Sequence, residues 1–331
     1  MRSGSALKLM FSDADWGDKM SKTDLLQFEA NTLTKMPNVP NHWNPREFGC
    51  IIVEQSVCED RIYMNPPANK LPEFDAPPLE ESILSVEFER LADWKIPHYG
   101  AFWTTIRESY PKADAQVPLA PAPNDPTAPA SLRISTGDTN LARACCVNES
   151  GTMQVQVQND RFLTTWARKN TTDEYPRYRE TRPNFERKWG LFLKFIEKEG
   201  LPSPRPTRCE ITYVNHVGST GDWSALQSPE RIFAPWSGKQ TNGYLPKPNM
   251  VSAVTQYAMP EGELTVALQP AIRVSDNSKL VQLILVARLP LREGANTQSI
   301  LHCFDLGREW IVRGFADITT TELQSIWKRK D

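Results

Sequence analysis

The sequence lacks the patterns by which common catalytic and metal-binding sites are recognised. Its four histidines are scattered, its six cysteines form no Cys-x-x-Cys pair, and no His-Glu-x-x-His segment occurs. Because a metal site needs three or four clustered ligands, no metal centre is predicted. A glycine-rich phosphate loop and a Gly-x-Ser-x-Gly turn are also missing, so neither marks a nucleotide site or a serine nucleophile. We therefore predict no cofactor and assign no catalytic residue.

Long apolar runs and a strong net charge are missing too. No apolar run approaches the ~20 residues that span a membrane, and the first residues do not resemble a secretory signal. The formal net charge is −2, so the chain as a whole gives no electrostatic case for nucleic acid. Cysteines without paired spacing are typical of reduced thiols. We expect a cytoplasmic protein that contacts no membrane; its oligomeric state is left open.

Regular periodicity begins at Pro77, and three regions are predicted from it. Residues 1–76 are expected to form an N-terminal extension that is partly disordered or arm-like. Residues 77–205 and 206–331 are expected to form the two halves of a folded body. A proline-rich insertion at 118–129 interrupts the first half.

Each half is predicted to run from a strand through a connection to two or three strands and a long helix. Alternating apolar and polar residues predict strands at 84–88, 131–147, 153–158, 162–166, 209–213, 250–258, 263–272 and 279–289. Apolar residues at helical spacing predict helices at 97–110, 182–199 and 300–315. Asn159-Asp160 is typical of a hairpin turn, and Thr319 with Glu322 matches a capping box for a last short helix.

The repeated order of elements predicts the fold class. Two such units indicate an α+β fold, built as a pseudo-duplicated antiparallel sheet with long helices packed on one face. The TATA-binding-protein-like and helix-grip-like arrangements have this shape. This comparison concerns topology alone and implies no function.

Aromatic side chains and arginines are concentrated in one stretch, Phe162 to Ile196. Aromatic faces interleaved with arginines can stack on planar groups and bind anions. The candidate ligand-binding residues are Trp166, Arg168, Tyr175, Arg177, Tyr178 and Arg182. In the alternative interpretation, Trp166 packs beneath the following helix while Tyr175 and Tyr178 anchor the loop to it.

Several segments between Pro77 and Trp327 occur together in a recognisable order. They are Pro77–Phe88, Phe162–Trp166, Tyr175–Tyr178, Tyr213–Asn215, Leu301-His302, Phe315 and Thr319–Glu322. In this order they resemble a sporadically distributed family of uncharacterised prokaryotic proteins. The resemblance implies a soluble α+β protein and supplies no activity. The N-terminal extension and the proline-rich insertion depart from that family, and either could carry a partner contact.

Three functions are compatible with these features. The leading hypothesis is a non-catalytic binding or scaffold protein that engages a partner protein or a small anionic ligand. Sporadic distribution suggests, by analogy, a mobile defence or conflict system. The first alternative is an enzyme for a nucleotide or phosphate substrate, with Arg168, Arg177 and Arg182 holding the anion. The second is nucleic-acid binding through residues 161–208, which contain twelve basic and six acidic residues.

Overall fold

The computed structural model describes residues 70–119, 143–218, 225–236, 244, 246, 248–273 and 276–330. The chain divides into two units, Met1–Asn69 and Lys70–Asp331, and every described residue belongs to the second. Most of the predicted extension and of the proline-rich insertion therefore lies outside the described residues.

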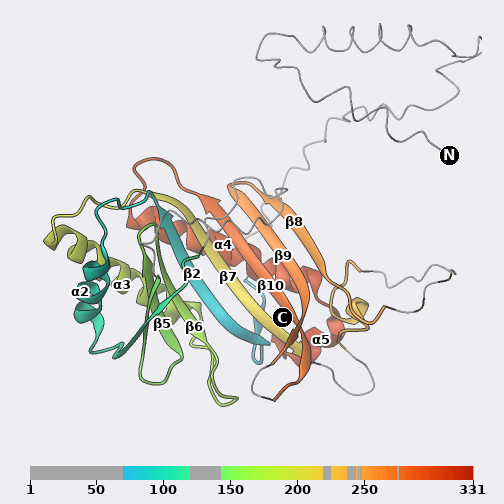
Figure 1. The fold of residues 1–331 in the computed structure, drawn as a ribbon. Helices are drawn as coiled ribbons and strands as arrows, with labels where there is room; N and C mark the ends of the chain where they lie inside the picture. Colours follow the sequence, from blue (N-terminus) through green and yellow to red (C-terminus); the bar gives the residue numbers. More distant parts are fainter. Residues whose placement is uncertain are drawn as a thin grey trace, which may run out of the picture. The chain divides into compact units, whose positions relative to one another are not determined.

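Nine antiparallel strands form a single sheet in the order β3-β4-β5-β6-β2-β7-β10-β9-β8 (Figure 1). Their bounds are β2 (Leu79–Phe88), β3 (Lys112–Gln116), β4 (Arg143–Val147), β5 (Met153–Gln158), β6 (Arg161–Ala167), β7 (Pro206–Gly218), β8 (Ala253–Met259), β9 (Gly262–Ile272) and β10 (Lys279–Pro290). Two further short strands, β1 (Glu73–Phe74) and β11 (Arg329–Lys330), pair with each other apart from this sheet.

Helices α3 and α4 pack across one face of the sheet, behind it in the view of Figure 1. The helices in the described residues are α2 (Ile96–Ile106), α3 (Tyr178–Lys198), α4 (Thr297–Ile318) and α5 (Thr321–Ile326), with one 3-10 turn at Pro229–Arg231. The predicted α+β fold with its antiparallel sheet is thus confirmed. None of these helices combines the length and apolarity that crossing a membrane requires.

The core forms because the alternating strands and the apolar helix stripes meet on this face. Phe162 of β6 lies 5.7 Å from the ring of Phe185 and 5.2 Å from that of Phe192, both on α3. On α4, a Cβ added to Gly307 would lie 3.1 Å from Leu289 and 3.2 Å from Ile211. The missing side chain at residue 307 therefore lets α4 pack close to β7 and β10.

The hairpin of β5 and β6 turns at Asn159-Asp160 as predicted. Two local predictions were wrong. Helix α3 begins at Tyr178 and not near Arg182, because the amides of Glu180 and Thr181 both donate to the carbonyl of Arg177 and start the helix one turn earlier.

The predicted capping box at Thr319 and Glu322 does not form. Helix α5 is preceded by Thr320, which makes no side-chain cap. The hydroxyl of Thr319 instead donates to the carbonyl oxygen of Phe315 at 2.6 Å, within the end of α4. Glu322 pairs with Arg231 at 2.6 Å. A local backbone carbonyl thus takes the side chain of Thr319, and a distant arginine takes that of Glu322, so neither is left for the capping box.

The sheet has the same strand order on either side of its central pair, β2 and β7. Moving outward from β2 the chain supplies β6, β5 and β4, and moving outward from β7 it supplies β10, β9 and β8. The first half differs by the addition of β3 and α2. The structural duplication of the two halves stays a prediction.

Strand β1 lies before Pro77, and Pro77 is the residue at which the folded body was predicted to begin. Phe74 of β1 is buried, with its ring 5.3 Å from that of Phe315 and 6.5 Å from that of Trp327. Its backbone pairs with Arg329 of β11. The residues just before Pro77 therefore take part in the core.

Candidate functional site

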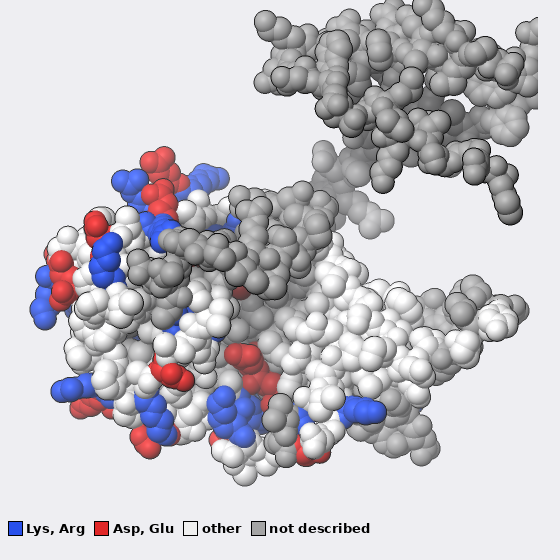
Figure 2. Space-filling model, viewed as in Figure 1, with Lys and Arg blue, Asp and Glu red and all other residues white. Residues whose placement is uncertain are grey.

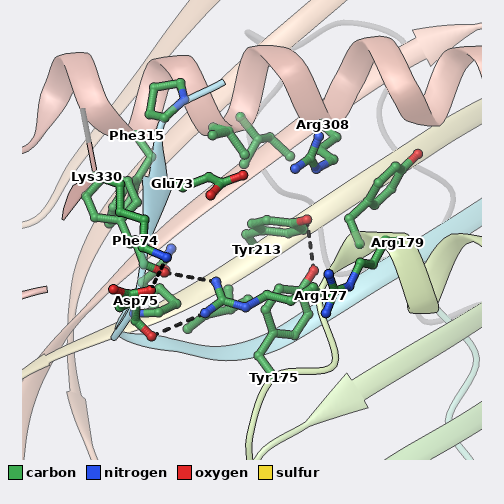
Figure 3. A pocket seen from close by; sticks show the side chains of 17 residues that line it. Glu73, Phe74, Asp75, Tyr175, Arg177, Arg179, Tyr213, Arg308, Phe315 and Lys330 are labelled. Atoms are coloured by element: carbon green, nitrogen blue, oxygen red, sulfur yellow. Dashed lines mark hydrogen bonds and ion pairs between the residues drawn. The ribbon is translucent and has the colours of Figure 1, made fainter. Parts of the chain in front are cut away.

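A cavity of about 460 Å³ opens where several distant parts of the chain meet (Figure 3). Its walls come from β1, the loop that leads into α3, β7, α4 and β11. Four basic side chains and two acidic ones line it, which leaves an excess of two positive charges. The basic residues are Arg177, Arg179, Arg308 and Lys330, and the acidic ones are Glu73 and Asp75.

Two tyrosines give one side of the cavity polar groups. The hydroxyl oxygens of Tyr175 and Tyr213 lie 3.1 Å apart, and one donates to the other. Behind them, the ring of Trp166 lies 5.2 Å from that of Tyr175. The pKa of Tyr213 is raised well above its ordinary value. Burial is the main cause, and the neighbouring Tyr175 is the second. Tyr213 is therefore protonated at neutral pH and can donate a hydrogen bond.

Arg177 ties the loop before α3 to β1. Its guanidinium donates to the carbonyl oxygens of Phe74 at 2.9 Å and Asp75 at 3.2 Å. Its backbone has φ 68° and ψ 158°, a region that residues other than glycine rarely adopt. Such backbone strain persists only where surrounding contacts fix it, and these two hydrogen bonds supply them.

Asp75 and Lys330 close the same wall. The ammonium of Lys330 lies 2.6 Å from a carboxylate oxygen of Asp75. This hydrogen bond is the main reason why the pKa of Asp75 is lowered. Both side chains are about half exposed, so water screens the pair.

Arg308 enters the cavity from α4 and carries the charge that the fold leaves most available. Its guanidinium lies 4.9 Å from the ring centre of Tyr178. Among the described residues, no carboxylate forms an ion pair with it. The nearby Asp305 is occupied elsewhere: it accepts from the Tyr178 hydroxyl at 2.7 Å and from two nitrogens of Arg182 at 2.8 and 2.9 Å.

Three of the six predicted ligand-binding residues line the cavity: Tyr175, Arg177 and Tyr178. Tyr178 is mostly buried and presents its ring, because its hydroxyl is bound to Asp305. Burial is the largest cause of the raised pKa of Tyr178, and this hydrogen bond is the second. Tyr178 therefore lines the cavity, as the ligand-binding interpretation expects, and its buried side chain also acts as an anchor, as the packing interpretation expects.

The other three predicted residues lie outside the cavity lining. Trp166 is buried behind Tyr175, as the packing interpretation expects. Arg168 donates to the carbonyl oxygens of Asp173 and Leu79 and lies 3.4 Å from Glu80. Arg182 is held by both oxygens of Asp305.

Sequence reasoning missed Tyr213 and Arg308. Tyr213 was assigned to the apolar alternation of a strand and to a segment of the family resemblance, but not to the ligand-binding residues. Arg308 stands within the apolar stripe of α4, four residues after Phe304 and three before Ile311. A charged side chain at such a position is a signal that could have identified it, because an arginine on a buried stripe needs a polar environment.

Three arginines of the basic stretch 161–208 are paired with carboxylates. Arg161 and Arg208 contact the carboxylate of Glu87, and Arg205 lies 3.3 Å from Glu89. Figure 2 likewise shows basic and acidic side chains interspersed. These pairs reduce the positive charge that the stretch could offer to a nucleic acid.

No group of three or more histidine, cysteine or carboxylate side chains in the described ranges is arranged to hold a metal ion. The four described cysteines are buried free thiols. No family model matches the chain, and no curated protein matches it significantly. The resemblance to a prokaryotic family therefore stays a prediction.

Proposed function

We propose that the protein is a non-catalytic binding protein whose cavity takes a small anionic ligand. The observation that carries this proposal is Arg308, which projects into the cavity without a carboxylate partner among the described residues (Figure 3). A permanently charged planar guanidinium beside tyrosine hydroxyls matches a carboxylate or a phosphate. The excess of two positive charges favours the same class of ligand.

The beginning of α3 adds to this preference. The helix has 21 residues, and its first residues, Tyr178 and Arg179, line the cavity. The first amides of a helix have no partner within it, and the helix dipole favours negative charge there. Two separate features therefore favour an anion at the same place: the excess positive charge, to which Arg308 contributes, and the start of α3.

The rest of the cavity is apolar and suits a ligand with a hydrocarbon or planar part. Phe74, Leu79, Ile311 and Phe315 line it together with the ring of Tyr175. A ligand that placed its acidic group near Arg308 would lay its body against these side chains. We therefore propose a small organic acid or organic phosphate over inorganic phosphate alone.

Binding can be tested with a panel of aromatic and aliphatic carboxylates, nucleoside monophosphates and inorganic phosphate, first by thermal shift and then by calorimetry. Removing a charge-assisted hydrogen bond costs about 1.5–3 kcal/mol, so Arg308→Gln should weaken the best ligand by about 10- to 100-fold. Affinity should also fall as salt rises.

Arg187→Gln is the matched control, because Arg187 is an exposed arginine on α3 outside the cavity. It should leave affinity unchanged. If no anion of the panel binds, or if both variants lose affinity equally, the cavity is not the anion site.

A further inference from the structure

The two edges of the nine-stranded sheet differ in how they are protected. The edge strand β3 is exposed at all five residues and carries Lys112 and Asp114. Charged side chains of this kind discourage another strand from pairing with an edge. The opposite edge strand, β8, has the sequence Ala-Val-Thr-Gln-Tyr-Ala-Met and contains no charged residue. Only the β3 edge therefore carries this protection.

Apolar side chains are exposed along and beside β8. Val254 is 68% exposed, Tyr257 is 36% exposed, and Ile272 at the end of the neighbouring β9 is 63% exposed. In the view of Figure 2, the side of the molecule that carries β8 and β9 shows almost no charged atoms. Val254 and Tyr257 are three positions apart and therefore lie on opposite faces of β8, so exposed apolar side chains flank this strand edge on both sides. Exposed apolar side chains beside an unpaired strand edge favour association.

We propose that β8 pairs antiparallel with β8 of a second copy of this chain, about a two-fold axis at Gln256. Antiparallel pairing of a strand with itself is symmetric, so one patch serves both partners. This register places Val254 opposite Ala258 of the second copy and Thr255 opposite Tyr257. A β-branched residue facing an aromatic one is a favourable cross-strand pair, and two glutamine amides at the axis can exchange hydrogen bonds.

The charges at the two ends of this edge favour the antiparallel arrangement. Glu261 and Glu263 lie where β8 turns into β9, and Glu263 is also 3.5 Å from Arg288. Arg273, which is also 3.3 Å from Asp276, follows β9 beyond the start of β8. A two-fold axis brings the acidic end of one copy toward the basic end of the other, whereas a parallel pairing would align like ends. No like charges face each other along β8 itself.

The size of the edge sets the strength of the association. A seven-residue strand buries less than the roughly 1,200 Å² of a standard stable interface. The dimer is therefore concentration-dependent. None of the residues that line the cavity lies on β8 or β9, so the dimer does not depend on the proposed ligand site.

Sedimentation velocity of the full chain between about 1 and 100 μM tests the association, since weak dimers form in this range. We expect the sedimentation coefficient to rise with concentration. Gln256→Lys and Gln256→Glu each place like charges at the axis, so each variant alone should stay monomeric. An equimolar mixture of the two should dimerise again, because opposite charges then face each other.

Ala113→Lys on the exposed β3 edge is the control and should dimerise like the unmodified chain. Circular dichroism checks that each variant is folded. If Gln256→Lys is not, a charge exchange at Val254 and Ala258 together takes its place, with both residues changed to Lys in one variant and to Glu in the other, because these two positions face each other across the axis. The proposal is overturned if the unmodified chain stays monomeric at the highest concentration. It is also overturned if a folded Gln256→Lys dimerises normally, or if the mixture fails to restore the dimer.

Discussion

Tyr175 and Tyr213 share a hydrogen bond 3.1 Å long although they are 38 positions apart in the sequence. Tyr213 comes from the central strand β7, and Tyr175 from the loop that leads into α3. The bond fixes that loop against the sheet and so shapes the side of the cavity that the hydroxyls line.

Alkaline pH should weaken the fold through the buried tyrosines. The folded-state pKa of Tyr213 is raised well above the ordinary value of about 10, and that of Tyr178 is raised as well. Their contribution to stability is present in full below pH 10 and is lost as the pH rises further, because the unfolded chain ionises first. Tyr213→Phe should reduce this alkaline loss, as measured by urea unfolding at several pH values.

The strained backbone at Arg177 predicts an unusual order of stabilities. Arg177→Ala removes two hydrogen bonds to backbone carbonyls and keeps a conformation that alanine disfavours, so it should cost about 1–3 kcal/mol. Arg177→Gly removes the same bonds but relaxes the strain, so it should be more stable than the alanine variant by about 1 kcal/mol. Chemical denaturation compares the two. An alanine variant at least as stable as the glycine variant would show that the strain is absent.

Glu87 should contribute far more to stability than Glu89, although the two are near neighbours. Glu87 is mostly buried and contacts both Arg161 and Arg208, whereas Glu89 and its partner Arg205 are largely exposed. Breaking a buried pair costs about 3–5 kcal/mol, and breaking an exposed one about 1 kcal/mol or less. Glu87→Gln and Glu89→Gln form the matched pair for urea unfolding. Equal losses would contradict the assigned burial.

Trp166 is predicted to stabilise the fold and to act on the ligand only through Tyr175. Trp166→Ala should cost about 3–5 kcal/mol, because it empties a large buried volume behind the tyrosine. The exposed Trp236→Ala should cost about 0.5 kcal/mol or less. Thermal and urea unfolding both report this contrast.

The sequence predicted what depends on local periodicity. The alternation of valine and glutamine in β5, the Asn159-Asp160 turn and the apolar stripe of α4 each fix an element through its immediate neighbours. Pairing between distant segments could not be predicted in this way. The partner of Arg182, for example, is Asp305, which lies 123 positions later.

The candidate site was predicted only where it lies on one continuous stretch. Tyr175, Arg177 and Tyr178 were found because they are close together in the sequence. Tyr213 and Arg308 join them only after β7 and α4 have packed, so no local pattern groups them. Arg168 lies outside the cavity lining: two backbone carbonyls and the carboxylate of Glu80 hold its guanidinium, and nothing in the sequence marks the two carbonyls as acceptors.

The pairing of β1 with β11 also sets the order in which the cavity can be completed during synthesis. Phe74 and Asp75 leave the ribosome early, but their partners Arg329 and Lys330 follow more than 250 residues later. A nascent chain that has passed Tyr213 already contains both tyrosines, yet it still lacks Arg308 and the closing strand. The cavity is therefore complete only after residue 330 has been translated, and a prematurely terminated product would carry much of the sheet without the strand that closes the cavity.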